Sequence, residues 1–448
     1  MHDESTQLAV GINDKMPLGQ TIIYALQHLF ALTGIWAFPV IIGHVLHLKS
    51  EQTALMVQAC FFTTGLVTIL QSGRLLRLPV VQGPTAAFMV AVMGSANSVG
   101  LATTFGSMTV AALIFALLAL PVKKFGLMGL LIRYISPPIV FGSLLVIIGA
   151  QLAAIGPGSW FDASASGSVG ISALVAAITM LTVMGCLIFA RRDLIKRGAL
   201  LWGIIVGTIA FSLLAGWHLP NFSHTSMLAL PDIYPFGFGV SWPIVLLMMM
   251  AFLQASAEAM GMYSLLTRWG KQKLTPERVN RGLFTEFIGC AIGSVAGGLG
   301  TTSYPENVGI IRVSGIASRF VTMTAGIFAL ILGLIPKVGL LVASIPTPVL
   351  SAASSILFGI IAISGIQMLA KVNWDERNIA VAAPAFIISL GSMYLPASVT
   401  ALLPPSLKDI LAQPMMIGVI LLIVLNTLVN FIIRKPEADA ALQPEQEV

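Results

Sequence analysis

The sequence has 448 residues, of which 57% are hydrophobic and only 9% are charged, and its mean hydropathy is +0.93. Soluble domains carry roughly 25% charged residues, so this composition excludes a soluble globular protein and indicates an all-α polytopic membrane protein. The net charge is +6, but the basic residues are dispersed in short loops and form no contiguous patch, so no nucleic acid is expected as a partner.

The N-terminal stretch MHDESTQLAVG is polar and acidic, and no basic region precedes an apolar core. This pattern argues against a cleaved signal peptide. Cys60, Cys186 and Cys290 all fall inside apolar segments, where cysteine usually serves as a small packing residue. Neither a disulfide framework nor a metal site is expected.

The apolar segments follow one another along the whole chain. A spanning helix needs roughly 20 mostly apolar residues, and two further segments, near 79–96 and 301–317, are apolar but short, because Gly83-Pro84 breaks one and Pro305 the other. The expected total is fourteen spans. The twelve unbroken candidates lie near 20–43, 52–70, 102–121, 138–157, 170–190, 198–217, 241–265, 280–298, 319–336, 347–370, 377–395 and 412–433.

The distribution of basic residues supports this number of spans, because Lys and Arg concentrate in cytoplasmic loops. With fourteen spans and both termini inside, all but four of the 24 Lys and Arg residues fall in inside loops. The exceptions are Lys49, Lys337 and Lys408 in outside loops and Arg312 within a span. A miscount by one helix would scramble this separation.

The two broken segments are the third and the tenth in order, so each is the third element of a seven-helix half. Halves with an odd number of spans have opposite orientations. Paired interrupted segments in inverted repeats indicate the binding site of a transporter, with helix N-termini facing the substrate. The two halves share little residue identity, so the inference of a repeat rests on the topology and the two breaks alone.

Ionisable residues inside expected spans are His28, Glu258, Glu286 and Glu306, with Arg312 as a possible fifth. Burying charge in a membrane is costly, so each is a functional candidate by default. The alternative for each residue is a buried structural hydrogen bond or ion pair.

Glu258 lies among small residues in LQASAEAMGM, which would let a ligand or a helix approach closely, and its carboxylate suits a ligand rich in N–H groups. Glu306 follows the break at Pro305, beside a helix N-terminus whose free amides favour an anion or a ligand carbonyl. Both are predicted to bind the substrate. Asn307 either contacts or positions the ligand, or caps that helix.

Glu286, between Phe284 and Phe287, is predicted to organise the site. It either relays a proton or belongs to a structural network with Arg312 or a hydroxyl group. Arg312 belongs to that network or snorkels to the cytoplasmic side. His28, after Gln27, either contacts substrate or forms a bond between helices.

Gln82 and Thr85 flank the other break and would orient the backbone or the ligand, the alternative being plain turn chemistry. Motifs of soluble enzymes are absent: there is no P-loop, no GxSxG elbow and no His/Cys cluster with metal spacing. Transport would therefore use an ion gradient or run downhill, without a cofactor.

The stretch PENVGIIRVSGIASR, from Pro305 to Arg319, resembles the signature of the nucleobase/ascorbate transporter family, which includes uracil and xanthine/urate permeases. Three further landmarks of that family occur in the same order: Gln27-His28, QGPTAAF from Gln82 to Phe88, and AEAMG from Ala257 to Gly261. Together these matches cover nearly the whole chain.

The resemblance implies fourteen spans in a seven-plus-seven inverted repeat, with short β-strands in spans 3 and 10, a homodimer, and an elevator-type movement. The implied segments are a cytoplasmic segment 1–18, a core domain from 19–136 and 236–338, a gate domain from 137–235 and 339–435, and a cytoplasmic tail 436–448.

The resemblance also implies that Glu258 and Glu306 are the principal substrate-binding side chains, helped by the backbone at Ala86 and Asn307. Two positions depart from the family pattern. Met262 stands where uracil permeases tend to have His and xanthine/urate permeases Asp, and it cannot exchange a proton. Glu306 resembles the uracil permeases, whereas SGIASR resembles the xanthine and urate permeases, which usually have Gln at 306.

The leading hypothesis is a symporter that moves a nucleobase, either a purine of the xanthine/urate type or uracil, across a bacterial-type inner membrane. Its co-transported ion is expected to be a proton, with sodium as the alternative. A second hypothesis is an anion carrier of the same overall fold, although two acidic residues at the site oppose it. A membrane-embedded enzyme or a channel has no supporting motif.

Overall fold

The computed structural model describes residues 8–32, 34–122, 126–129, 137–153, 155–164, 166–191, 195–196, 198–223, 225–400, 402 and 414–433. Lys408, the first seven residues of the expected N-terminal segment and the expected tail 436–448 lie outside these ranges.

Helices dominate the first half of the described chain, as the long apolar runs require. Their ends follow local chemistry: the side chain of Gln52, for example, accepts a hydrogen bond of 3.1 Å from the backbone N–H of Lys49 at the start of α3. The elements are α1 (Leu18–Ala31), α2 (Gly34–Val45), α3 (Ser50–Leu70), the π-helical turn η1 (Gln71–Leu75), β1 (Gln82–Pro84), α4 (Ala86–Leu118), α6 (Pro138–Ala153), α7 (Ile155–Gly158), η2 (Ser159–Phe161), α8 (Val169–Phe189) and α10 (Ala199–Ala215).

The second half is built in the same way. Thr275 caps α12 by accepting a hydrogen bond from the N–H of Arg278, and Pro276 occupies its first turn, where no N–H is needed. The elements are α11 (Trp242–Trp269), α12 (Pro276–Val295), β2 (Thr301–Ser303), α13 (Pro305–Ser314), α14 (Arg319–Gly333), α15 (Pro336–Ala343), α16 (Thr347–Leu369), α17 (Glu376–Gly391), η3 (Ser392–Tyr394), α18 (Ala397–Thr400), α20 (Pro414–Thr427) and the π-helical turn η4 (Leu428–Ile432).

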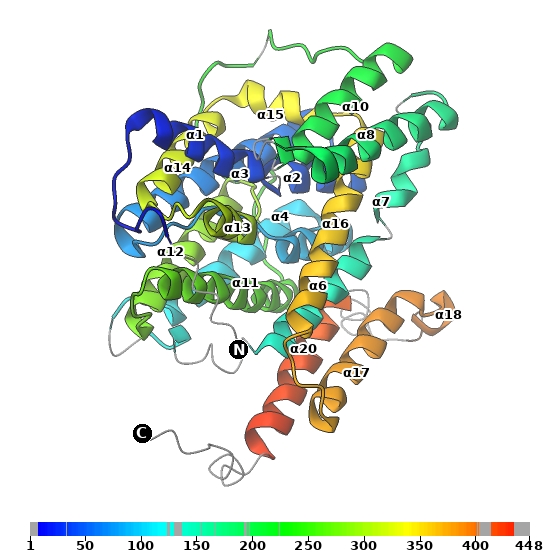
Figure 1. Cartoon of the computed structure of the whole chain (residues 1–448). Coiled ribbons are helices and arrows are strands. Elements are labelled where there is room, and N and C mark those ends of the chain that lie inside the picture. The colour runs from blue at the N-terminus through cyan, green and yellow to red at the C-terminus, as the bar shows by residue number, and fades with distance from the viewer. Residues whose placement is uncertain are drawn as a thin grey trace.

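The helices pack in two groups that are not contiguous in sequence (Figure 1). Helices α1 to α4 pack with α11 to α15, so this group, called group A below, joins the first part of each half. Helices α6, α8, α10, α16, α17 and α20 pack with one another and form group B. Contacts of α2 with α16, and of α4 and α11 with α6, join the two groups.

Two short strands lie in the middle of group A. β1 and β2 pair antiparallel, with Gln82 opposite Ser303 and Pro84 opposite Thr301, and all six strand residues are buried. Neighbouring groups complete the hydrogen bonding: the N–H of Gln82 donates to Thr68 Oγ1 at 2.9 Å, and the N–H of Thr301 contacts Cys290 Sγ at 3.1 Å. Protein atoms thus satisfy backbone that could not be left bare in lipid.

A helix starts directly after each strand. α4 begins at Ala86 and α13 at Pro305. Because the strands are antiparallel, these two helices leave the strand pair in opposite directions. Each helix is interrupted at a glycine with positive φ, Gly100 at 78° within α4 and Gly315 at 69° after α13. The breaks expected near Gly83-Pro84 and Pro305 therefore lie at these strands, and the helical parts of the expected segments 79–96 and 102–121 meet at the non-helical residue Gly100.

Six described helical segments are long and apolar enough to cross a membrane, or up to seven if α14 and α15, which are bent by 82°, count as one span. Pro138–Ala153, Ala199–Ala215 and Ile417–Ile432 are shorter apolar helices. The chain is thus a mostly helical, multi-pass membrane-type protein, and the number fourteen stays a prediction.

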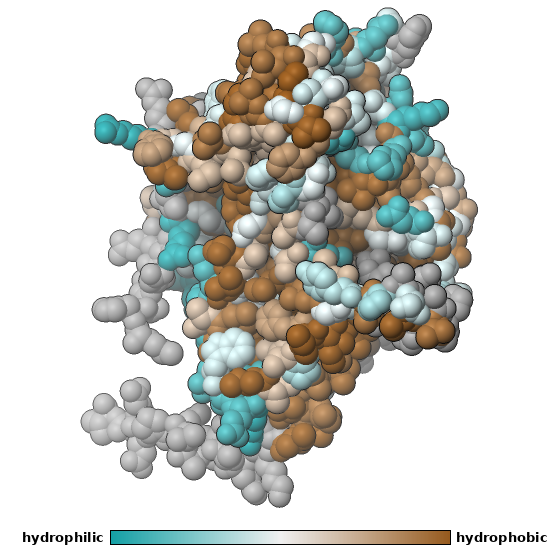
Figure 2. Space-filling view, turned by 90° about the vertical axis from the view of Figure 1, so that its right-hand side faces the viewer, coloured by the Kyte–Doolittle hydropathy of each residue, from teal (hydrophilic) through white to brown (hydrophobic). Residues whose placement is uncertain are grey.

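Large apolar side chains are exposed on the outer helices. Phe189 on α8, Leu213 on α10 and Ile387 on α17 are 79%, 82% and 72% exposed. Figure 2 shows a face of the molecule on which hydrophobic residues form broad areas between scattered hydrophilic ones. Such areas would be unstable in water and fit contact with lipid chains.

Helices α3 and α14 approach closely at Gly65. A Cβ atom there would lie 2.6 Å from the carbonyl oxygen of Gly326 and 2.6 Å from Cα of Leu330, so only glycine fits. We expect Gly65→Ala to lower the free energy of unfolding by about 1–3 kcal/mol, measured as a lower melting temperature in detergent. The control is Gly185→Ala on α8, where no atom lies within 4 Å of the added Cβ. Equal melting temperatures for the two variants would contradict this packing.

Candidate functional site

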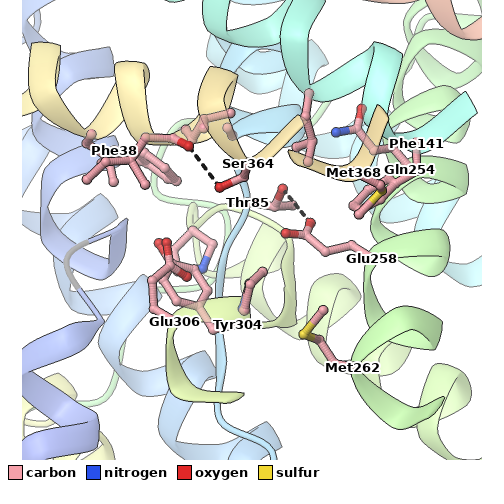
Figure 3. Close-up of a pocket in the computed structure, with 17 residues that line it drawn as sticks. Phe38, Thr85, Phe141, Gln254, Glu258, Met262, Tyr304, Glu306, Ser364 and Met368 are labelled. Atoms are coloured by element: carbon pink, nitrogen blue, oxygen red, sulfur yellow. Dashed lines mark hydrogen bonds between the residues drawn. The ribbon is translucent and has the colours of Figure 1, made fainter. Parts of the chain in front are cut away.

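A cavity of about 130 Å³ lies between groups A and B, beside the starts of α4 and α13. Figure 3 shows its labelled side chains converging from both groups. This volume is several times the roughly 10–15 Å³ that one water molecule needs and suits a small ligand. The lining residues are Phe38, Pro84, Thr85, Ala86, Phe141, Leu145, Gln254, Glu258, Met262, Tyr304, Pro305, Glu306, Leu357, Ile360, Ile361, Ser364 and Met368.

Two helix N-termini reach this cavity. Thr85 caps α4, since its side chain accepts a hydrogen bond of 3.3 Å from the N–H of Ala87, and Ala86 is the first residue of the helix. Pro305 and Glu306 form the start of α13. The first amides of a helix have no partner within it and carry partial positive charge, so both ends favour a ligand carbonyl or anion.

Glu258 lies in α11 and faces the cavity across from Thr85, whose hydroxyl lies 3.3 Å from Glu258 Oε2 (Figure 3). Only 8% of its surface is exposed. Glu306 faces the same cavity and lies close enough to interact electrostatically with Glu258. Oε2 of Glu306 is buried without a hydrogen-bond partner. The two carboxyl groups therefore offer acceptor capacity that the protein leaves largely unused.

Asn307 and His28 lie behind the cavity and do not line it. The amide of Asn307 donates to the backbone oxygen of His28 at 3.5 Å, which links α13 to α1, and its Oδ1 atom has no hydrogen-bond partner. Both side chains are buried. The structure thus places Asn307 where it ties the start of α13 to α1, one residue away from Glu306.

Glu286 lies at the centre of a buried hydrogen-bond network away from the cavity. Its Oε1 atom accepts bonds from Tyr263 OH at 2.7 Å, Ser303 Oγ at 2.8 Å, Gln82 Nε2 at 2.9 Å and Gln71 Nε2 at 3.3 Å. These donors come from α11, β2, β1 and η1. Glu286 thereby connects both strands to the helices that carry the site, and two of its partners are hydroxyl groups.

Gln82 belongs to this network and does not line the cavity, since its amide also donates to Gln71 Oε1 at 2.6 Å and Ser303 Oγ at 3.0 Å. Arg312 lies in the last turn of α13 with an exposed side chain. The structure brings Glu258, Glu306, Thr85 and Ala86 together at the cavity. It places Gln82, Asn307, His28, Glu286 and Arg312 elsewhere.

Sequence reasoning missed several lining residues. Tyr304 packs its ring against β1, where a Cβ on Gly83 would lie 2.7 Å from the ring, so the packing favours glycine there. Gln254 lies one helical turn before Glu258, and a search for polar residues at i−4 of the key carboxylate would have found it. Phe38 and Phe141 carried no signal beyond hydrophobicity.

Among the described residues, no group of three or more His, Cys, Asp and Glu side chains is placed to hold a metal ion. Cys60 and Cys290 are buried free thiols beside β2, where Cys60 Sγ accepts from the N–H of Leu299 at 3.4 Å. They pack in the core, as their apolar context indicated.

A helical membrane protein with a cavity between two helix groups, faced by interrupted-helix N-termini and carboxyl groups, is typical of a membrane transporter. Residues 19–398 match the model of the Permease family Xan_ur_permease. The chain belongs to this family, which confirms the family identified from the sequence, and it is a permease and not an enzyme.

Two relatives illustrate the match. The chain is 30% identical over 429 residues to the uric acid transporter UacT of Escherichia coli strain K12, covering 92% of this chain and 86% of that protein. It is 27% identical over 440 residues to the xanthine permease of Bacillus subtilis strain 168, covering 95% of this chain and 98% of the relative.

Two solved structures share the fold. The murine anion transporter Slc26a9 in its inward-facing state matches with a TM-score of 0.62 at 11% identity, over 92% of this chain and 69% of that one. The transmembrane domain of the cyanobacterial bicarbonate transporter BicA matches with a TM-score of 0.55 at 16% identity, over 93% and 99%. At such identities the likeness concerns the fold alone.

The Glu286 network generates a stability prediction. Glu286→Leu removes the acceptor of four buried donors, so we expect it to lower the free energy of unfolding by about 3 kcal/mol or more. Glu286→Gln keeps one acceptor oxygen, and because Oε2 of Glu286 has no hydrogen-bond partner, its cost should be clearly smaller. Melting temperatures of the purified variants measure both effects. Equal losses for the two variants would show that the network does not depend on this oxygen.

Proposed function

We propose that this permease is a secondary active transporter that moves a nucleobase, specifically an oxopurine of the xanthine or uric acid type, with uracil as the competing substrate. The observation that supports this most is the cavity in which Glu258 and Glu306 face two helix N-termini. The names of the two relatives, a uric acid transporter and a xanthine permease, support the choice of substrate.

The chemistry of the site matches a nucleobase edge. An oxopurine presents ring N–H groups next to carbonyl oxygens. The carboxyl oxygens of Glu258 and Glu306 accept from N–H groups, and the positive ends of α4 and α13 favour carbonyl oxygens. Phe38, Phe141 and Tyr304 supply aromatic surface for a flat ring. The polar edge of the base therefore finds hydrogen-bonding groups in the cavity, and its apolar ring face finds aromatic side chains.

An anion carrier is the second candidate because the similar solved structures transport anions. A site for an anion should offer helix N-termini and a cation, without carboxyl groups beside them. Here Glu258 and Glu306 both face the cavity, and Arg312 lies exposed at the other end of α13. The nucleobase hypothesis fits this charge arrangement, and the anion hypothesis does not.

We further propose fourteen spans in a seven-plus-seven inverted repeat, with the termini in the cytoplasm and the protein in a bacterial-type inner membrane. The antiparallel strand pair and the helices that leave it in opposite directions support the inversion. The Lys and Arg distribution supports the orientation.

The division into groups A and B supports an elevator mechanism with a core domain of 19–136 and 236–338 and a gate domain of 137–235 and 339–435. Group A contributes Thr85, Gln254, Glu258 and Glu306 to the cavity, whereas group B contributes mainly apolar residues of α6 and α16. The core domain could therefore carry a substrate past an apolar wall without breaking its polar contacts. Such transporters need a fixed gate domain, and we expect a homodimer to provide it.

Proton coupling is proposed through Glu306. Met262 lines the cavity one turn beyond Glu258 and cannot exchange a proton, so the carboxyl groups are the titratable groups at hand. A protonated Glu306 gives one hydrogen bond and accepts one, as a glutamine would, and pairs with a lactam edge. Binding that requires the protonated form takes up a proton, so affinity should rise as pH falls.

The substrate assignment predicts a specific thermal shift. Xanthine or uric acid should raise the melting temperature of the purified protein, since a ligand adds about RT ln(1 + [L]/Kd) to stability. Uracil, guanine, hypoxanthine, ascorbate, sulfate and bicarbonate complete the panel. Glu258→Gln should lose the oxopurine shift while its own melting temperature stays close to that of the wild type. A shift with bicarbonate or sulfate and with no base would contradict the nucleobase assignment.

The coupling proposal predicts a changed pH profile. Uptake by the wild type should increase as the external pH falls, whereas Glu306→Gln, which mimics the protonated carboxyl permanently, should respond less to pH. Uptake of labelled xanthine into vesicles at several pH values, with and without a sodium gradient, measures this. The same pH dependence in both proteins would rule out proton linkage through Glu306, and dependence on sodium would replace the proton as the coupled ion.

A further inference from the structure

The side-chain amide of Gln254 has a buried oxygen that no protein group satisfies. It lies on α11, one turn before Glu258, lines the cavity, and is only 2% exposed. Its Oε1 atom has no hydrogen-bond partner. Buried polar side chains are hydrogen-bonded in the large majority of cases, and a hydrogen bond left unmade costs free energy. An unsatisfied amide at the wall of a binding cavity therefore indicates a place for a ligand group.

The neighbours of Gln254 in the cavity do not provide that partner. Figure 3 shows Gln254 beside Phe141 and Met368, which are apolar. The nearby polar groups are engaged elsewhere: the hydroxyl of Thr85 contacts Glu258, and the hydroxyl of Ser364 donates to the backbone oxygen of Ile360 at 2.8 Å. The amide of Gln254 is thus available to a ligand in the part of the cavity next to Glu258.

The position of Gln254 relative to the two glutamates gives the site a direction. One helical turn, about 5.4 Å along α11, separates Gln254 from Glu258. In Figure 3 Glu306 lies across the cavity from Glu258, and Gln254 lies above Glu258 in the view. A flat ligand held at Glu306 and Glu258 would extend toward Gln254 if it were longer than a single six-membered ring.

We propose that Gln254 is a specificity-determining residue that hydrogen-bonds the five-membered ring of a bicyclic oxopurine, which rests on the nucleobase function proposed above. A primary amide donates and accepts at once, and the five-membered ring of xanthine offers an N–H and an acceptor nitrogen. Uracil has no second ring and would leave Gln254 unpaired. A site built to hydrogen-bond a group discriminates strongly against a ligand that lacks it.

Binding of matched ligands to purified variants tests this proposal. Xanthine methylated on the five-membered ring (N7 or N9) loses an N–H or acceptor there, whereas methylation at N1 or N3 alters the six-membered ring. We expect Gln254→Leu to weaken xanthine and uric acid binding about tenfold or more, with little change for uracil. In this variant, methylation at N7 or N9 should no longer reduce affinity, while the effect of methylation at N1 and N3 stays as in the wild type.

The matched control is Gln151→Leu on α6, because Gln151 Oε1 also lacks a hydrogen-bond partner but does not line the cavity. It should leave all affinities unchanged.

Gln254→Met serves as a second variant of similar length, and the melting temperature of each ligand-free variant reports its folding. The proposal is overturned if xanthine binding is unchanged, or if all four methylxanthines and uracil lose affinity equally. If the wild type binds oxopurines and Gln254→Leu binds them with the same affinity, only the role of Gln254 is rejected. If the wild type binds no base, the nucleobase function itself is rejected.

Discussion

The antiparallel pairing of β1 with β2 is the constraint on which the rest of the site depends. Backbone that leaves a helix at membrane depth must have its N–H and C=O groups satisfied by protein. Here the two strands satisfy one another, with help from Thr68 and Cys290. Because this pairing allows helical structure to be interrupted inside the protein and to begin again, α4 and α13 each present a helix N-terminus to the same cavity.

The buried glutamates divide two tasks between them. Glu286 has its Oε1 atom surrounded by donors from both strands and two helices, and it holds the frame together. Glu258 and Glu306 have few partners and face the cavity. A carboxyl group satisfied by protein is structural, and one left unsatisfied at a cavity is available to a ligand. Gln82 and Gln254 differ in place: Nε2 of Gln82 donates within the network, whereas Gln254 lines the cavity.

The sequence predicted the membrane class, the family and the two breaks, because charge in apolar segments and prolines within them are local signals. The same signals singled out Glu258 and Glu306, which the structure places at the cavity. It did not predict which side chains share a cavity. Gln82 and Thr85 flank the same break, yet one enters the Glu286 network and the other lines the cavity. Successive residues of an extended chain point to opposite sides, and these two positions differ by an odd number. The apolar wall from α6 and α16 depends on packing between distant segments and leaves no motif in the sequence.

A structure determined by electron microscopy with saturating xanthine tests the central claim most directly. We predict density for one xanthine in the cavity between groups A and B, in contact with Glu258, with its six-membered ring toward Glu306 and its five-membered ring toward Gln254. Density for xanthine at another place in the protein, with this cavity unchanged, would contradict the site described here.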